Sequence, residues 1–189
     1  MRRWLWTWML CAMVATAGAR AQEAGALLAE AQQALAAGQV ERAYAASYAA
    51  ALALFQKRPF GVENTVLVAE EPSGYAMYTP RESNRYRPGE TILVYLEPVG
   101  YRIEEGDVVR YGFAADLELY TGDGQFLGRV DNFLDTLFEA RKPNLASFLL
   151  FSIDLDGVPA GEYVLQLRVR DLLDPDARVD VAVPIVMVE

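Results

Sequence analysis

The chain has 189 residues, of which 53 % are hydrophobic, and a formal charge of −9. A chain of this length can bury a substantial core without disulfides, and its only cysteine is Cys11. The acidic balance disfavours nucleic acid and anionic lipid as partners, because like charges repel.

Residues 1–21 are predicted to be a secretory signal peptide. Arg2 and Arg3 precede an apolar run over residues 4–17, and Ala19-Arg20-Ala21 has the small residues that flank a cleavage site. The apolar run is short for a bilayer span, so we expect cleavage after Ala21, with an uncleaved anchor as the alternative. Cleavage removes three arginines and no acid, which leaves a formal charge of −12. The expected location is periplasmic or secreted, without stable membrane insertion after cleavage.

Residues 22–58 are predicted to form a helical hairpin broken at Gly38. They are rich in alanine, which has the highest helix propensity. Apolar side chains recur at helical spacing, namely Leu27, Leu28, Ala31 and Leu35, then Val40, Ala43, Tyr44, Tyr48, Ala51, Leu52 and Phe55. The pattern over residues 36–43, with Tyr48 and Pro59, resembles one tetratricopeptide-type hairpin. Such repeats need neighbours, so the resemblance implies that the hairpin docks on the rest of the chain or on a partner; a plain helical hairpin is the alternative.

Residues 62–189 show the two-residue alternation of strands that bury one face. The alternation is cleanest over residues 111–120 and 163–170, and Gly122 and Gly124 mark a hairpin turn between strands. We expect about seven to nine short strands, over residues 64–69, 75–78, 91–97, 111–120, 125–130, 133–140, 145–155, 163–170 and 179–188. The fold class is therefore mainly β, with an N-terminal helical hairpin.

Two turn phrases resemble those of secreted immunoglobulin-like and fibronectin-like modules. They lie at residues 86–90 (Tyr-Arg-Pro-Gly-Glu) and 155–163 (Leu-Asp-Gly-Val-Pro-Ala-Gly-Glu-Tyr). The resemblance covers residues 62–189 and implies an antiparallel immunoglobulin-like β-sandwich, a fold that hosts many unrelated functions. A closed barrel of lipocalin type is the alternative.

After cleavage at Ala21 the chain has no histidine and no cysteine, which excludes a Ser-His-Asp triad and thiol catalysis. A Ser-Lys pair would need Lys57 or Lys142, both in segments predicted to be exposed. Acid–base chemistry with two carboxylates stays open. Its candidates are the acidic residues on predicted strands, Glu97, Asp116, Glu118, Asp135 and Glu139. The alternative is that these carboxylates lie solvated on the outer faces of the sheets.

Two acidic clusters offer oxygen ligands for calcium. One is Asp154 with Asp156, and the other is Asp171 with Asp174 and Asp176. Calcium takes six to eight oxygens, and aspartates at strand ends also bond their own backbone in turns. We therefore predict no metal and no cofactor.

The stretch over residues 75–102 is unusual because tyrosine and arginine gather there in an acidic chain. These residue types are enriched at binding hot spots. The predicted ligand-binding or partner-binding residues are Tyr75, Tyr78, Arg81, Arg85, Tyr86, Tyr95, Tyr101 and Arg102. The alternative is that the tyrosines pack on the rim of the sandwich while the arginines pair with Glu70, Glu71 and Glu90.

These observations favour a non-enzymatic exported binding or interaction module of the bacterial cell envelope. Its expected partner is a protein or small ligand of the envelope. Two alternatives stay open at this point: a glycan-active enzyme that uses a carboxylate pair, and a purely structural envelope component.

Overall fold

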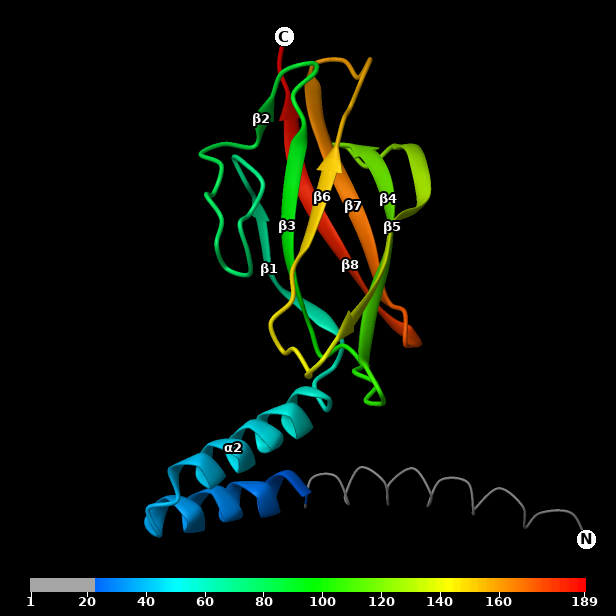
Figure 1. Cartoon of the computed structure of the whole chain (residues 1–189). Helices are drawn as coiled ribbons and strands as arrows, with labels where there is room; N and C mark the ends of the chain where they lie inside the picture. Colours follow the sequence, from blue (N-terminus) through cyan, green and yellow to red (C-terminus); the bar gives the residue numbers. More distant parts are fainter. Residues whose placement is uncertain (1–22) are drawn as a thin grey trace, which may run out of the picture. The chain divides into compact units, whose positions relative to one another are not determined.

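The computed structural model of the protein describes residues 23–189, so the predicted signal peptide lies outside the described residues (Figure 1). The chain divides into two compact units, of which the first ends at Lys57 and the second is Arg58–Glu189. Each unit is described by itself below.

The first unit is a helical hairpin, as predicted. One helix covers residues 23–36, and α2 covers Val40–Phe55. Gly38 lies between them with a φ of +71°, a conformation that glycine adopts without strain. The two helices bury small side chains, among them Ala31, Ala34, Ala43 and Ala46. No helix among residues 23–189 is long and apolar enough to cross a membrane.

The second unit holds two β-sheets (Figure 1). The smaller sheet has the order β1 (Gly61–Leu67), β3 (Ile92–Val99), β6 (Leu149–Ile153). The larger sheet has the order β2 (Arg85–Tyr86), β8 (Asp174–Met187), β7 (Gly161–Asp171), β4 (Val109–Thr121), β5 (Phe126–Ala140). All neighbours are antiparallel except β2 and β8, which are parallel. The mainly β, antiparallel architecture is thus confirmed, in two separate sheets.

The inner faces of the sheets supply the core. The larger sheet contributes the alternating residues that the sequence predicts, including Tyr111, Phe113, Ala115, Leu117, Tyr163, Leu165, Leu167, Val169, Val181, Val183 and Ile185. The smaller sheet contributes Ile92, Val94, Leu96, Leu149, Phe151 and Ile153. The rings of Phe133 on β5 and Phe151 on β6 stack at 6.3 Å between centroids, which joins the two layers.

Residues 125–130 and 133–140 are not two strands, as predicted, but one strand, β5. Its register against β4 shifts between Ala115, which pairs with Leu134, and Leu117, which pairs with Val130. Asn132 adopts a φ of +49° within this bulge. A β-bulge lets a strand bend without ending, so the break in the sequence pattern marks a kink instead of a turn.

The segment between β1 and β3 also differs from expectation. Residues 75–78 form no strand; they belong to a tight turn, in which Met77 N–H donates to Gly74 O at 3.1 Å. The residues between this turn and β3 contain β2, which pairs with the end of β8. β3 continues through Pro98, which pairs with Val62 on β1. The pairing of β3 with β6 ends at Leu96, so Pro98 has a strand neighbour on one side only, as proline in a sheet requires.

Candidate functional site

The structure separates the eight predicted site residues into three places. Tyr75, Tyr78 and Tyr95 meet on the outer face of the smaller sheet. Arg81, Arg85 and Tyr86 lie at and just before β2. Tyr101 and Arg102 follow the end of β3. The eight residues therefore do not form one continuous surface.

The first place is a group that we name the tyrosine cluster: Tyr75, Tyr78, Tyr95 and Glu97. Tyr95 is fully buried, with its ring 4.4 Å from that of Tyr78 and 5.4 Å from that of Phe148. Tyr95 and Glu97 share the outer face of β3 because they are two residues apart on a strand. The turn over residues 73–77 brings Tyr75 to the same place.

Glu97 is 4 % exposed, so it is not the solvated outer-face carboxylate that the sequence suggested. Its oxygens accept hydrogen bonds from Tyr95 Oη at 2.8 Å, Asn64 Nδ2 at 2.8 Å and Tyr75 Oη at 3.4 Å. All three donors are neutral groups. A buried carboxylate is tolerated where such donors replace water.

Burial raises the pKa of Tyr95 to about 12, with its bond to Glu97 acting in the same direction. Tyr95 therefore keeps its proton at neutral pH and remains a hydrogen-bond donor to Glu97. Its hydroxyl oxygen also accepts the backbone N–H of Ala76 at 2.8 Å. Ala76 has a φ of +56°, which disfavours residues with a Cβ. The tyrosine cluster thus holds the turn on the sheet.

The second place lies around Arg81. Its guanidinium carbon is 4.2 Å from the centre of the Tyr86 ring, and its Nη2 donates to Arg85 O at 2.9 Å and to Glu90 at 3.3 Å. Tyr86 is 1 % exposed, and burial raises the pKa of its hydroxyl. Tyr86 Oη and Arg81 Nε are buried without a hydrogen-bond partner among the described residues.

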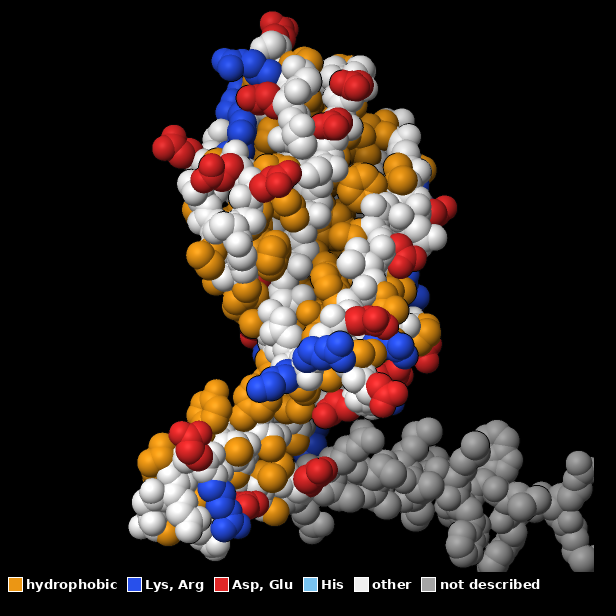
Figure 2. All heavy atoms as spheres, viewed as in Figure 1, with side chains coloured by type: hydrophobic (Ala, Val, Ile, Leu, Met, Phe, Trp, Pro, Cys, Tyr) orange, Lys and Arg blue, Asp and Glu red, His pale blue; other side chains and the backbone are white. Residues whose placement is uncertain are grey.

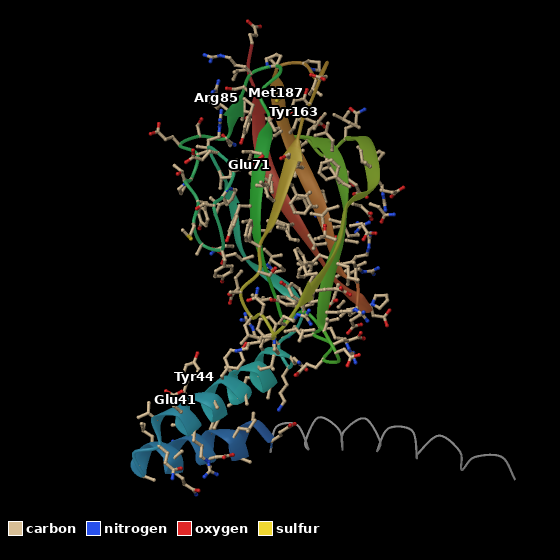
Figure 3. All side chains as sticks on the ribbon, in the orientation of Figure 1. Glu41, Tyr44, Glu71, Arg85, Tyr163 and Met187 are labelled. Carbon is tan, nitrogen blue, oxygen red and sulfur yellow. The ribbon has the colours of Figure 1, made fainter. Side chains whose placement is uncertain are left out.

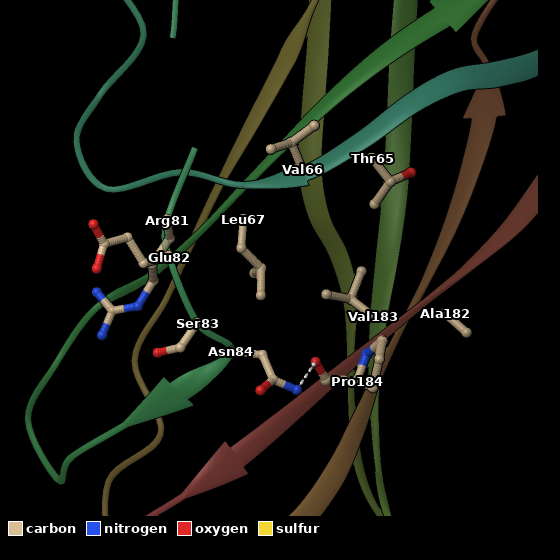
Figure 4. A pocket seen from close by; sticks show the side chains of 10 residues that line it. All are labelled: Thr65, Val66, Leu67, Arg81, Glu82, Ser83, Asn84, Ala182, Val183 and Pro184. Atoms are coloured by element: carbon tan, nitrogen blue, oxygen red, sulfur yellow. Dashed lines mark hydrogen bonds between the residues drawn. The ribbon is translucent and has the colours of Figure 1, made fainter. Parts of the chain in front are cut away.

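A groove of about 440 Å³ adjoins this place (Figure 4). Its walls come from β1, from the segment before β2 and from β8, and its lining is Thr65, Val66, Leu67, Arg81, Glu82, Ser83, Asn84, Ala182, Val183 and Pro184. Asn84 Nδ2 donates to Pro184 O at 3.1 Å across one end. The lining contains one carboxylate, Glu82, so this groove lacks the pair that glycoside hydrolysis needs.

The third place is structural in character. Tyr101 is fully buried, with its ring 5.3 Å from Tyr111 and 5.1 Å from Phe113. Its hydroxyl donates to Asn144 O at 2.7 Å. Arg102 contributes its backbone N–H, which donates to Asp171 at 2.6 Å.

The outer face of the larger sheet also buries carboxylates. Asp116 and Glu118 on β4 are 3 % and 7 % exposed, again contrary to the expected solvated positions. Arginines from the neighbouring strands cover them, and we name Asp116, Glu118, Arg129, Arg168 and Arg170 the arginine network. Both Nη atoms of Arg170 bond Asp116, while Arg129 bonds Asp116 at 2.7 Å and Glu118 at 3.1 Å. Arg168 lies 3.6 Å from Glu118.

The Arg170 hydrogen bonds lower the pKa of Asp116 to about 2, and the N–H of Asn132, which donates to Asp116 at 3.0 Å, acts in the same direction. A carboxyl group with so low a pKa carries no proton at neutral pH. Since a general acid needs a pKa near the working pH, Asp116 is unsuited to that role. The arrangement instead joins β4, β5 and β7.

The remaining carboxylates lie apart. Asp135 and Glu139 are exposed on β5, and Glu139 pairs with Arg110 at 2.9 Å. Asp154 accepts from Thr91 Oγ1 at 2.7 Å. Asp171 accepts the backbone N–H of Leu173 at 2.8 Å in a turn of its own, and burial raises its pKa. Within residues 23–189, no three His, Cys, Asp or Glu side chains gather as a metal site would require.

The helical unit presents apolar side chains to solvent. Val40 is 63 % exposed, Tyr44 is 70 % exposed, and Leu54 is also exposed. With Ala51 they lie on one side of α2 because of their spacing, and we name these four the α2 stripe. Tyr44 projects away from the helix over residues 23–36 (Figure 3). The stripe is distinct from the alanine face that α2 packs against that helix.

Sequence reasoning missed several residues that complete these sites. They are Asn64 and Phe148 in the surroundings of the tyrosine cluster, and Arg129, Arg168 and Arg170 in the arginine network. The sequence alternation puts the last two on an outward face, but the strand that lies beside them is known only from the structure. Arg168 and Arg170 occupy the outer face of β7, and Asp116 and Glu118 occupy the same face of the neighbouring β4.

Comparison with known proteins gives no family. No protein-family description and no curated protein matches the sequence. Among solved structures, the C-terminal domain of wzt aligns over 72 % of this chain and 85 % of its own length, with 11 % identity and a TM-score of 0.43. The PKD domain of an M14-like peptidase from Thermoplasmatales archaeon SCGC AB-540-F20 aligns over 70 % and 98 %, with 13 % identity and a TM-score of 0.33. Both TM-scores are below 0.5, and neither similarity supports a conclusion about this chain.

Proposed function

We propose that this chain is a non-enzymatic binding module of the bacterial cell envelope and that the α2 stripe contacts its partner. The observation that carries the proposal is the exposure of Val40 and Tyr44 on a helix whose other apolar face is already packed. Burying each large apolar side chain stabilises a complex by about 1.5–3 kcal/mol before the costs of association. Residues four apart on a helix are the usual anchors when a helix binds in a groove.

The sandwich supports the proposal as a scaffold. We infer an immunoglobulin-like arrangement, because the order β4-β7-β8 matches the C-F-G sheet of that fold, and β1-β3-β6 matches its A-B-E strands. Tyr163, at the start of β7, donates its hydroxyl to Pro159 O at 2.9 Å. This bond resembles the tyrosine corner of such domains. Folds of this kind place binding surfaces on a rigid support.

The enzymatic alternative has less support. A glycan-active enzyme would need two carboxylates across a cleft, one of them with a raised pKa. The buried acids Asp116 and Glu118 instead face arginines, and Glu97 faces neutral donors.

Export belongs to the same proposal. It rests on three features of residues 1–21: the positive charges of Arg2 and Arg3, the apolar run over residues 4–17, and the small residues Ala19 and Ala21 before Gln22. The mass of the protein recovered from the envelope fraction tests it. A species that begins at Gln22 is expected, and a species that retains Met1 contradicts cleavage.

Site-specific photo-crosslinking in cells tests the contact surface. A photoreactive side chain at Tyr44 should give a discrete product with an envelope component. The matched control is Ala45, which is exposed on another face of α2 and should give no such product. Equal labelling from both positions contradicts the proposal, and a product within the same chain would assign the stripe to an internal contact.

A further inference from the structure

The exposed side of α2 has the residue spacing of a coiled-coil seam. The α2 stripe and Ser47 follow one another at intervals of four and three residues, and we name these five residues the α2 seam: Val40, Tyr44, Ser47, Ala51, Leu54. All five are exposed. Alternating steps of four and three make the seven-residue repeat that keeps one side of a helix against a neighbouring helix. The spacing therefore indicates that the partner of this seam is a helix.

The side of the hairpin that carries the seam is free of charge on both helices. Arg42 pairs with Glu30 of the first helix at 2.9 Å, and this ion pair marks the opposite side. Residues two apart on a helix point in nearly opposite directions, because each residue turns the helix by about 100°. Leu28 therefore points away from Glu30, and for the same reason Val40 and Tyr44 point away from Arg42. Figure 2 shows acidic and basic side chains next to each other on the near side of the helical unit.

This apolar side is large enough for a specific interface. Leu28, Leu35, Val40, Tyr44 and Leu54 are 45–70 % exposed, whereas the contact between the two helices buries mainly alanines. Short helices gain most of their stability from packing of an apolar face. Covering the five large side chains on two copies would remove on the order of 1,000 Å² from water, which is about what a specific interface needs.

The sizes of the side chains in the seam fit a second copy of the same helix. When two α2 helices pair antiparallel about a two-fold axis between Tyr44 and Ser47, Tyr44 packs against Ser47 of the copy. Val40 then packs against Ala51 of the copy. Each layer sets a large side chain against a small one, so the two helices interdigitate without voids. In a parallel pair Tyr44 would meet Tyr44 and Ala51 would meet Ala51, which gives crowded and hollow layers.

The polar groups near the seam do not oppose this pairing. The hydroxyl of Ser47 donates to Ala43 O within α2 at 2.8 Å, so burial leaves it with a hydrogen-bond partner. Glu41 lies beside the seam and is exposed. In the antiparallel pair it would lie about 13 Å along the axis from Glu41 of the copy, at 1.5 Å per residue. Salt screens a repulsion over that distance.

We propose that two copies of this chain pair antiparallel through the α2 seam. The two hairpins then form a four-helix bundle with a two-fold axis, in which Leu28 and Leu35 face the first helix of the copy. Such an interface is self-complementary, since each residue that contacts its counterpart is contacted in return. The inference rests on the proposed function and deepens it, because it names the partner that the α2 stripe contacts.

Sedimentation velocity of the protein purified from the envelope fraction tests the proposal over a concentration series. The wild type should sediment as a dimer that dissociates on dilution in the micromolar range. Ala51→Glu should raise the dissociation constant more than about tenfold, because it sets a carboxylate against Val40 of the copy. Ala45→Glu is the matched control, since Ala45 is exposed on another face of α2, and should leave the dimer unchanged. Circular dichroism checks that both variants stay helical.

An exchange of side-chain sizes tests the register and the antiparallel sense. Tyr44→Ser leaves two small residues opposite each other, and Ser47→Tyr sets two tyrosines against each other. Each single variant should weaken the dimer about tenfold or more, because each change occurs twice in a two-fold dimer. The double variant restores one large and one small side chain in each layer and should recover wild-type affinity within about threefold. Single and double variants that are equally weak would overturn this pairing.

Other outcomes would overturn the dimer itself. A wild type that stays monomeric up to about 0.1 mM has no affinity of the proposed kind. Equal dissociation constants for Ala51→Glu and Ala45→Glu would mean that the seam is not the contact. Crosslinking from Tyr44 separates this inference from the proposed function. A product with twice the mass of the chain supports both, a product with another protein from a chain that is monomeric in solution overturns the dimer alone, and no product contradicts both.

Discussion

Both sheets bury carboxylates on their outer faces, and they satisfy them in opposite ways. In the tyrosine cluster, Glu97 accepts bonds from two tyrosine hydroxyls and an asparagine amide. In the arginine network, Asp116 accepts bonds from two guanidinium groups and one backbone N–H. The first arrangement relies on neutral donors and the second on charges.

The two arrangements stabilise different parts of the second unit. The neutral donors of the tyrosine cluster attach a turn to one sheet, since Tyr75 and the N–H of Ala76 belong to that turn. The cations of the arginine network come from β5 and β7 and converge on β4. Charge-assisted bonds are stronger than neutral ones, and removal of one partner leaves a buried charge. The arginine network should therefore matter more to global stability.

Arg170→Met should give the largest effect. The variant keeps an apolar side chain but leaves Asp116 with Arg129 and Asn132 alone, so we expect a loss of about 2–3 kcal/mol in unfolding free energy. Urea denaturation measures it. Glu97→Gln is the matched variant in the tyrosine cluster and should lose about 1 kcal/mol, because its neutral donors stay near a neutral acceptor. Equal losses would remove the contrast between the two faces.

Acid should act next most strongly, through the arginine network. The pKa of Asp116 is about 2 in the folded protein against an ordinary 3.8. A lowered folded pKa contributes stability above the ordinary value, and the contribution is lost as pH falls through the folded value. We expect a loss of about 1–2 kcal/mol between about pH 4 and pH 2.

Urea midpoints across that pH range check the acid effect. In Arg170→Met the loss should begin at higher pH, because the main cause of the lowered pKa is gone. Arg110→Met removes an exposed pair with Glu139 and should keep the wild-type profile. If the urea midpoint depends on pH in the same way in the wild type, Arg170→Met and Arg110→Met, then Asp116 does not cause the loss of stability in acid.

Tyr95→Phe should have a smaller and more local effect. It removes the hydroxyl that donates to Glu97 and accepts from Ala76, at a cost of about 1–2 kcal/mol. Amide hydrogen exchange should accelerate over residues 73–78 while the larger sheet keeps its protection. Tyr78→Phe keeps the ring contact with Tyr95 and is expected to change little. If hydrogen exchange accelerated equally in both sheets, the effect of Tyr95 would not be confined to the turn.

Ala76→Gly should have the smallest effect, and in the opposite direction. Relief of the positive φ outweighs the entropy of the added glycine by about 0.5 kcal/mol. Thermal unfolding should therefore occur at a slightly higher temperature. Gly74→Ala is the comparison variant in the same turn. Its added Cβ would lie 3.3 Å from the Met77 sulfur, so we expect no stabilisation. A destabilised Ala76→Gly would show that the turn is not strained.

The sequence was sufficient for what depends on local periodicity. The alternation around Phe113, Leu165 and Val183 identifies the inner faces that the structure buries. Gly38 marks the turn between the helices because its backbone conformation is a local property. The mainly β class and the helical hairpin follow from these patterns alone.

The buried carboxylates could not be found in that way. An acidic residue that alternates with apolar ones normally indicates solvent on that face. Asp116 departs from this rule because arginines on the two adjacent strands cover it, among them Arg170, which lies 54 residues further along the chain. Glu97 departs from it because a turn without periodicity folds over it. Both depend on strand order and register, which one sequence does not specify.

The bulge in β5 has a consequence for how this chain tolerates changes of length. Between Val130 and Leu134 the strand contains two residues more than its partner needs. Because side chains alternate with a period of two, an even surplus leaves the downstream residues facing the same way, and Phe138 still stacks on Tyr111. An insertion of two residues at 131–132 should therefore keep Phe138 facing the interior, whereas an insertion of one residue would rotate Phe138 out of it.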